Sequence, residues 1–292
     1  MNTLDKTKKI PLKKGWSNDQ KTILKSKDST VLLRVMDASK YQRKIQEIQY
    51  LSSLDLFPIQ HSQPLSVELI KCKTHFITSY IEGTDLFETL SSLPINQQIH
   101  LGLQAGYALK QIHTQIKVQN DGSWEKRYKA KIETKIKSYH ECRINFEHDE
   151  ILIQRIYELM PLLKDRPQAF QHGDYHVGNF VVDLDGNLGI LDFDRWDIGN
   201  PWEEFNRITW CREKSTVFSS AMIEAYFDFQ IPQQFFELMF LYIAVNAIGS
   251  LSWAQDFGQE EVDVALHLID QFDQDTDHFS KIKPSWFKPT RL

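Results

Sequence analysis

The stretch His-Gly-Asp-Tyr-His-Val-Gly-Asn at residues 172–179 concentrates polar residues and glycines directly before a sequence typical of a β-strand. In phosphoryl transfer, an aspartate accepts or orients the attacking hydroxyl, and an asparagine a few residues later holds a metal ion. Asp174 and Asn179 have these chemical types. The stretch therefore indicates a phosphoryl-transfer loop.

A further aspartate, Asp192, ends an apolar run behind a predicted β-hairpin. The runs NFVVD and LGILDFD flank the turn LDGN, in which Asp185-Gly186 supplies hairpin chemistry. The hairpin is expected to bring Asp192 back beside Asn179. Mg²⁺ prefers oxygen ligands, keeps some waters and is usually completed by substrate phosphates, so these two residues are a sufficient protein contribution.

Each residue alone has an ordinary structural explanation, because an aspartate at a strand end caps a turn and an asparagine after glycine tolerates left-handed backbone. The joint pattern, HGDxxxxN followed by an apolar run ending in DFD, is poorly explained by turn chemistry. A hydrolase with two metal ions about 4 Å apart is an alternative, but it needs more histidine and aspartate ligands. Only His172 and His176 are nearby in sequence.

The joint pattern resembles that of the aminoglycoside phosphotransferase and choline kinase group, which are small-molecule kinases with a protein-kinase-like fold. The resemblance covers nearly the whole chain. It implies that Asp174 is the catalytic base, that Asn179 and Asp192 bind Mg²⁺, and that His172 braces the catalytic loop. Glu204, three residues after a proline, stands where the family often has aspartate. It is expected to brace the loop or cap a helix rather than touch substrate.

The same resemblance implies that ATP or GTP is the phosphoryl donor and assigns nucleotide contacts to the N-terminal lobe. Arg34 stands where the group usually has a phosphate-gripping lysine, a departure that keeps the charge but changes the geometry. Glu47 resembles the helix glutamate of the family and is expected to pair with Arg34. Ser17 would contact a phosphate, and the backbones of Ser79 and Ile81 would pair with the purine edge.

The predicted elements around these residues agree with the α+β, bilobal, protein-kinase-like fold that the resemblance implies. A β-hairpin over residues 20–36, one amphipathic helix from Lys40 to Leu56 and two strands within residues 66–81 indicate an antiparallel N-terminal sheet with one main helix. Pro58 follows the helix as a stop signal. Gly83 marks the change of pattern, so the predicted domains are residues 1–82 and 83–292.

The second lobe is predicted to be mainly helical. An apolar stripe runs through residues 99–116, and residues 117–131 are expected to form a surface loop. Further helices are predicted over residues 131–139, 149–163, 201–211, 217–229, 235–253 and 260–272.

The acceptor is left open by the sequence. Carboxylates of the C-terminal helices suit a polycationic acceptor such as an aminoglycoside, whereas tryptophans there suit an apolar or cation-π site. An amino alcohol, a sugar or another metabolite is an equal alternative, so the sequence does not decide between antibiotic resistance and metabolism. A nucleotide-binding scaffold without transfer activity is another alternative. The residues in question are Glu224, Asp228, Asp256, Glu260, Glu261, Trp202, Trp210 and Trp253.

The composition of the 292 residues, 41% hydrophobic and 25% charged, is that of an ordinary globular protein. A net charge of -5 gives no basic footprint for nucleic acid. Three widely spaced cysteines predict neither disulfides nor zinc, and favour the cytoplasm. No secretion signal is expected, because no apolar region follows the N-terminal lysines, and no membrane span is expected, because Glu237 and Asn246 interrupt the most apolar stretch. The expected partner is a small acceptor, and the chain a monomer or homodimer.

Overall fold

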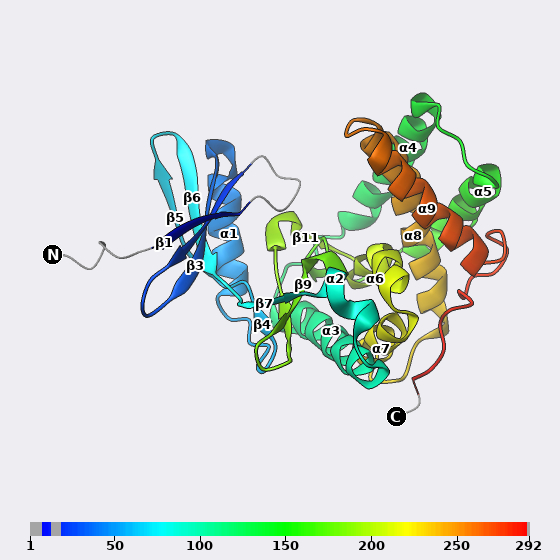
Figure 1. Ribbon diagram of the computed structural model, residues 1–292. Coiled ribbons are helices and arrows are strands. Elements are labelled where there is room, and N and C mark those ends of the chain that lie inside the picture. The colour runs from blue at the N-terminus through cyan, green and yellow to red at the C-terminus, as the bar shows by residue number, and fades with distance from the viewer. Residues whose placement is uncertain (1–7, 13–18, 291–292) are drawn as a thin grey trace. The chain divides into compact units, whose positions relative to one another are not determined.

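The computed structural model describes residues 8–12 and 19–290. The chain forms two compact units, one of Met1–Thr84 with Val181–Phe193 and the other of Asp85–Phe180 with Asp194–Leu292. The first is built on antiparallel strands and the second on helices (Figure 1), which confirms the predicted α+β class. Residues 172–179, which begin with His-Gly-Asp, are called the HGD loop below. The hairpin that follows this loop belongs to the first unit, although it lies within the second predicted domain.

The main sheet of the first unit has five antiparallel strands in the order β1-β2-β3-β6-β5 (Figure 1). Their bounds are Lys8–Leu12 for β1, Gln20–Lys25 for β2, Thr30–Asp37 for β3, Pro64–Ile70 for β5 and Lys73–Ser79 for β6. The register pairs Arg34 with Phe76 on the neighbouring strand. Sequence analysis did not predict the edge strand β1, because its five residues are largely exposed and lysine-rich.

The helix of this unit, α1, spans Tyr41–Leu51 after a 3₁₀ turn at Ala38–Lys40. The prediction of one helix from Lys40 to Leu56 was therefore too long at its end. The hydroxyl of Ser52 donates to the carbonyl of Gln49 at 2.9 Å, and Asp55 accepts from the N–H of Phe57 at 3.0 Å. Such local side-chain bonds compete with helix continuation.

A second sheet of four short strands, in the order β4-β10-β9-β7, carries the predicted hairpin. The strands are β4 (Gln60–His61), β7 (Gly83–Asp85), β9 (Phe180–Asp183) and β10 (Leu188–Ile190). The carboxylate of Asp183 accepts from the backbone N–H groups of Asp185 and Asn187, and Gly186 at the turn has φ +83°. The hairpin and its turn are thus confirmed.

The helices α3 (Ile95–Gln115) and α7 (Thr216–Tyr226) pack closely in the second unit (Figure 1). Two glycines allow this approach, because a Cβ at Gly102 or Gly106 would lie 2.4 Å or 2.1 Å from a carbonyl oxygen of α7. The predicted stripe over residues 99–116 therefore forms a buried helix interface.

The remaining elements of this unit differ from the prediction in several places. The helix α4 begins at Trp124, within the expected loop of residues 117–131, because Trp124 stacks on buried Tyr128 with ring centroids 5.0 Å apart. The predicted helix 201–211 is a 3₁₀ helix followed by α6. The elements are α2 (Leu86–Thr89), α4 (Trp124–Cys142), α5 (Asp149–Leu159), β8 (Ala169–Gln171), η4 (Val177–Asn179), β11 (Asp197–Gly199), η6 (Pro201–Arg207), α6 (Ile208–Lys214), α8 (Gln233–Gln255) and α9 (Gln259–Asp275).

The helix α8 is the one helix within residues 8–12 and 19–290 that is long and apolar enough to cross a membrane. Of its most apolar window, 61% is buried inside the protein. A core helix of a globular protein has the same properties, so α8 is weak evidence for a membrane span.

Candidate active site

The HGD loop follows strand β8 and is shaped by a glycine. Gly173 has φ +81°, and a Cβ there would lie 2.0 Å from the carbonyl oxygen of Arg195. Only glycine fits this backbone conformation and this close approach without strain. The loop backbone is therefore fixed at the residue before Asp174.

The carboxylate of Asp174 lies among three cationic or imidazole groups of its own unit. Arg207 Nε is 3.0 Å from Oδ1, His176 Nε2 is 3.5 Å from Oδ1, and Arg195 Nε is 3.9 Å from Oδ2. Oδ1 is buried, and it accepts no geometrically well-formed hydrogen bond from the described residues. A buried acceptor of this kind is suited to an incoming donor.

Opposing effects act on the ionisation of Asp174. Burial raises its pKa, whereas the polar contact with His176 and the charges of Arg207 and Arg195 lower it. The lowering effects are larger in sum and hold the pKa of Asp174 well below its ordinary value. Asp174 is thus an ionised carboxylate at neutral pH.

Glu204 is buried and joins the 3₁₀ helix η6 to the HGD loop. Its two carboxylate oxygens accept from the backbone N–H groups of His172 and Gly173, each at 2.8 Å. His172 Nδ1 in turn accepts from the N–H of Asp174 at 3.2 Å. These bonds tie η6 to the backbone of residues 172–174, and the bracing role of His172 and Glu204 stays a prediction.

Burial raises the pKa of Glu204 to about 8, and its two N–H donors oppose this shift. His113, whose Nε2 is 4.0 Å from Glu204, supplies no compensating charge, because burial lowers the pKa of His113 to about 3. The carboxyl of Glu204 is therefore held protonated over a pH range in which an unfolded chain would ionise it.

We expect Glu204→Gln to lower the free energy of unfolding by about 1–3 kcal/mol, because an amide cannot accept two N–H donors. Because folding raises the pKa of Glu204, the contribution of Glu204 to stability is fully present below the ordinary pKa of 4.5. It is lost as pH rises towards about 8, because ionisation then favours the unfolded chain. The advantage of wild type over the variant should therefore shrink across this range in urea unfolding. Glu158→Gln, at a half-exposed glutamate of α5, is the control; an advantage independent of pH would contradict the assignment.

The two predicted metal ligands each retain an unused oxygen. Asn179 Nδ2 donates to the carbonyl of Asp174 at 2.8 Å, and its amide oxygen accepts no hydrogen bond from the described residues. Asp192 Oδ1 accepts from Arg34 Nη1 at 3.0 Å, whereas Oδ2 has no such bond within residues 8–12 and 19–290. Both donors fit the oxygen chemistry of Mg²⁺, although they belong to different units.

Arg34 is buried in the first unit and bridges two carboxylates. Its Nη2 donates to Asp19 at 2.6 Å and its Nη1 to Asp192 at 3.0 Å. Lys40 Nζ lies 3.2 Å from Asp19. Burial raises the pKa of Asp19, but the hydrogen bonds and charges of Arg34 and Lys40 outweigh burial and hold this pKa below its ordinary value.

Glu47 pairs with a buried lysine of its own helix. Lys44 Nζ lies 2.5 Å from Glu47 and 4.7 Å from the ring centre of Phe76, the strand neighbour of Arg34. The helix α1 thus provides a buried lysine-glutamate pair against β6. The predicted pairing of Glu47 with Arg34 stays a prediction.

The other predicted nucleotide contacts have different surroundings. Ser79 ends β6 and uses its N–H to donate to the carbonyl of Gln63 at 2.8 Å. The side chain of Ile81 is buried, with its Cγ2 facing Gly189. Only its backbone is therefore suited to meet a ligand. Ser17 lies outside the described residues.

Two of the acidic residues considered for the acceptor already have partners. Glu224 is buried and accepts from the N–H of Thr290 at 2.9 Å, and Asp228 forms an ion pair with Lys110. These contacts favour structural roles for Glu224 and Asp228.

Arg195, Arg207 and Asp19 were not among the predicted site residues. Arg195 directly follows the DFD motif and Arg207 lies three residues after Glu204. Their closeness in sequence to the predicted site residues was the signal that could have indicated them. Asp19 lies two residues after Ser17, which was the predicted phosphate contact of this part of the chain.

The chain belongs to the phosphotransferase enzyme family, whose model matches residues 9–235. This confirms the resemblance inferred from the sequence. No curated protein matches the chain.

Solved aminoglycoside phosphotransferases have a similar fold. A thermostable mutant of APH(4)-Ia in its apo form gives a TM-score of 0.65 at 15% identity, covering 91% of this chain and 93% of that one. A variant of that mutant, in a ternary complex with ADP and hygromycin B, gives 0.64 at 16% identity over 91% and 92%. ADP-bound APH(2'')-Ib gives 0.60 at 15% identity over 92% and 95%.

Proposed function

We propose that this protein is a small-molecule kinase, which transfers the γ-phosphoryl group of ATP or GTP to a hydroxyl of a small acceptor. The observation that carries the proposal is the ionised carboxylate of Asp174, with its buried and unbonded Oδ1. Such an oxygen can accept a hydrogen bond from the hydroxyl of the acceptor. This bond orients a lone pair of the hydroxyl oxygen towards phosphorus. Family membership and the nucleotide complexes of similar structures support this proposal.

In the proposed reaction, the hydroxyl oxygen of the acceptor forms a bond to the γ-phosphorus. The bond from this phosphorus to the β,γ-bridging oxygen breaks, and the nucleoside diphosphate leaves with its electron pair. Asp174 takes the proton of the hydroxyl as the new bond forms. His172 and Glu204 would hold the loop backbone, which keeps Asp174 positioned.

Asn179 and Asp192 would hold Mg²⁺ through the oxygens that their hydrogen bonds leave unused. The ion would neutralise charge on the phosphate oxygens. Arg34 and Ser17 would contact phosphates, Glu47 would pair with Arg34, and the backbones of Ser79 and Ile81 would meet the base.

For the acceptor, we propose a hydroxyl compound that carries amino groups, either an aminoglycoside or an amino alcohol. Complexes of similar structures with hygromycin B and gentamicin support the first. An aromatic group beside the catalytic loop, Trp210 with its ring centre 5.6 Å from that of His176, is compatible with either cation. A sugar acceptor is the remaining alternative, and only an aminoglycoside would imply antibiotic resistance. A reaction on ATP or GTP suits the cytoplasm.

The proposal is tested by Mg²⁺-dependent phosphate transfer from ATP and from GTP to a panel of aminoglycosides, amino alcohols and sugars. Transfer to one class names the acceptor. Binding of Mg²⁺-nucleotide without transfer to any member would favour a nucleotide-binding scaffold over a kinase.

We expect Asp192→Asn to weaken Mg²⁺-nucleotide binding at least about tenfold, because one charged ligand of the ion is lost. Asparagine is the preferred substitution, since Asp192 has φ +60° and asparagine tolerates left-handed backbone. Asp185→Asn in the turn of the same hairpin is the matched control. Calorimetric titration with Mg²⁺-ATP measures the effect, and equal affinities of wild type and variant would exclude Asp192 as a ligand.

A further inference from the structure

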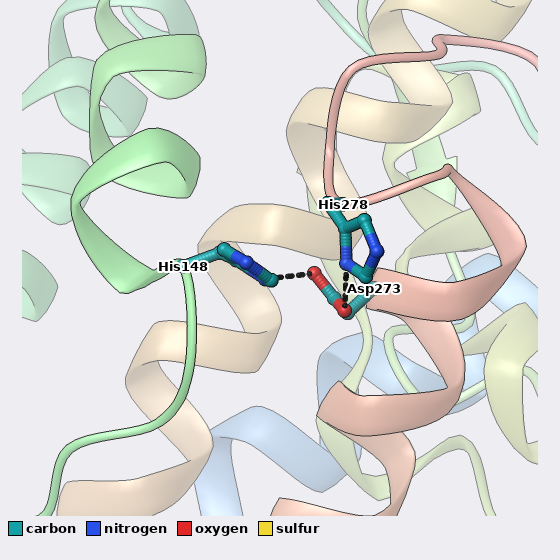
Figure 2. A group of neighbouring side chains, drawn as sticks. All are labelled: His148, Asp273 and His278. Carbon is teal, nitrogen blue, oxygen red and sulfur yellow. Dashed lines mark hydrogen bonds and ion pairs between the residues drawn. The ribbon is translucent and has the colours of Figure 1, made fainter.

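Two histidines and an aspartate meet in the second unit, outside the HGD loop (Figure 2). His148 Nδ1 lies 3.1 Å from Asp273 Oδ1, and His278 Nδ1 lies 2.9 Å from Asp273 Oδ2. One potential ligand atom from each residue lies within 4.8 Å of the others. The two imidazoles therefore approach the two oxygens of one carboxylate.

Three separate segments bring these residues together. His148 directly precedes α5, Asp273 lies in the last turn of α9, and His278 follows in a turn of three left-handed residues, Asp277–Phe279, with φ +53°, +56° and +58°. Arg155 of α5 donates to the carbonyl oxygens of Phe279 and Ser280, at 3.2 Å and 2.9 Å. The turn that presents His278 is thus held by the same helix that His148 precedes.

The spacing suits ligands of one metal ion. In a tetrahedral zinc site with bonds of about 2.0–2.1 Å, neighbouring ligand atoms lie about 3.3 Å apart. The two nitrogen-oxygen distances of 3.1 Å and 2.9 Å are close to this separation, so small side-chain movements would admit an ion.

The surroundings of the cluster are acidic. His148 Nε2 lies 3.8 Å from Glu147, and the carboxylate of Asp273 contacts both imidazoles. Lys281 pairs with Asp277, and Arg155 with Glu158. A divalent cation would therefore meet a buried carboxylate and a further acid beside the second nitrogen of His148. A carboxylate in that place orients a metal-binding imidazole.

We propose that His148, Asp273 and His278 form a binding site for a divalent transition metal, with Zn²⁺ as its ion. Two imidazoles and one carboxylate are ligands typical of Zn²⁺ rather than of Mg²⁺ or Ca²⁺. The side chain of His278 is 60% exposed, which gives the ion a path of entry and leaves a coordination position for water. The bound ion joins the start of α5 to the end of α9 and stabilises the folded state.

The test uses the full-length protein, freed of metal with a chelator and titrated with Zn²⁺ without nucleotide and in excess Mg²⁺. Mg²⁺ occupies oxygen-ligand sites, so the titration reports a nitrogen-containing site. We expect wild type to bind one Zn²⁺ per chain and His278→Ala to bind it at least about tenfold more weakly. His267→Ala is the matched control, because His267 is an exposed histidine of α9 beside Glu213 but outside the cluster.

Two further readouts separate a metal site from a hydrogen-bonded cluster. Zn²⁺ should raise the Tm of wild type and of His267→Ala, but not of His278→Ala or His148→Ala. Bound Co²⁺ should give visible absorption from nitrogen-containing coordination in wild type, but not in His278→Ala or His148→Ala. Equal Zn²⁺ affinity of wild type and both ligand variants, or absence of binding to wild type, would overturn the proposal.

Discussion

Asp174→Asn is expected to lower kcat for phosphoryl transfer by about 10³-fold, within the range for removal of a general base. The substitution keeps the size of the side chain and does not alter the backbone carbonyl that accepts from Asn179. It removes the negative charge of the carboxylate, which His176, Arg207 and Arg195 keep ionised. The variant can no longer take the proton of the hydroxyl, so the chemical step should slow while nucleotide affinity changes little.

The measurement is a steady-state transfer assay, with an independent titration of Mg²⁺-nucleotide. Asp197→Asn is the matched control, because Asp197 is an exposed aspartate of β11 that pairs with Arg127. A kcat of Asp174→Asn within about threefold of wild type would exclude Asp174 as the base. A parallel loss of nucleotide affinity would instead point to a disturbed loop.

Much of the fold follows from local sequence patterns. The hairpin around Asp185-Gly186 was predictable because its turn chemistry is contained within residues 183–187. The start of α4 was not, because Trp124 and Tyr128 stack on each other and make edge-on contacts with Tyr242, which is distant in sequence. Helix ends likewise depend on single hydrogen bonds, as at Ser52.

The candidate site was predictable where the motif is continuous and unpredictable where partners come from elsewhere. Asp174 and Asn179 share one loop, so their types and spacing indicate their chemistry. Arg207 reaches Asp174 from a separate helix, and the contact of Asp19 with Arg34 depends on the pairing of β2 with β3. No periodicity in the sequence records such contacts.

Arg34 illustrates how the structure changes the meaning of a departure from the family pattern. From the sequence alone, we expect arginine in place of lysine to change the geometry with which phosphates are bound. In the structure, its planar group donates to two carboxylates at once, which a lysine ammonium cannot match in geometry. We therefore infer that Arg34 has a structural function in addition to its proposed contact with phosphates.

Arg34→Ala should consequently lower the free energy of unfolding by about 3–5 kcal/mol, because it leaves Asp19 as a buried carboxylate with only Lys40 beside it. Urea unfolding measures this loss, and a nucleotide titration measures the phosphate role separately. The double variant Arg34→Ala with Asp19→Asn should recover part of the stability but none of the nucleotide affinity, since it removes the stranded charge without restoring a cation. If Arg34→Ala is as stable as wild type, the bridge to Asp19 is not needed for the fold. If only its affinity for nucleotide falls, the phosphate contact alone explains the residue.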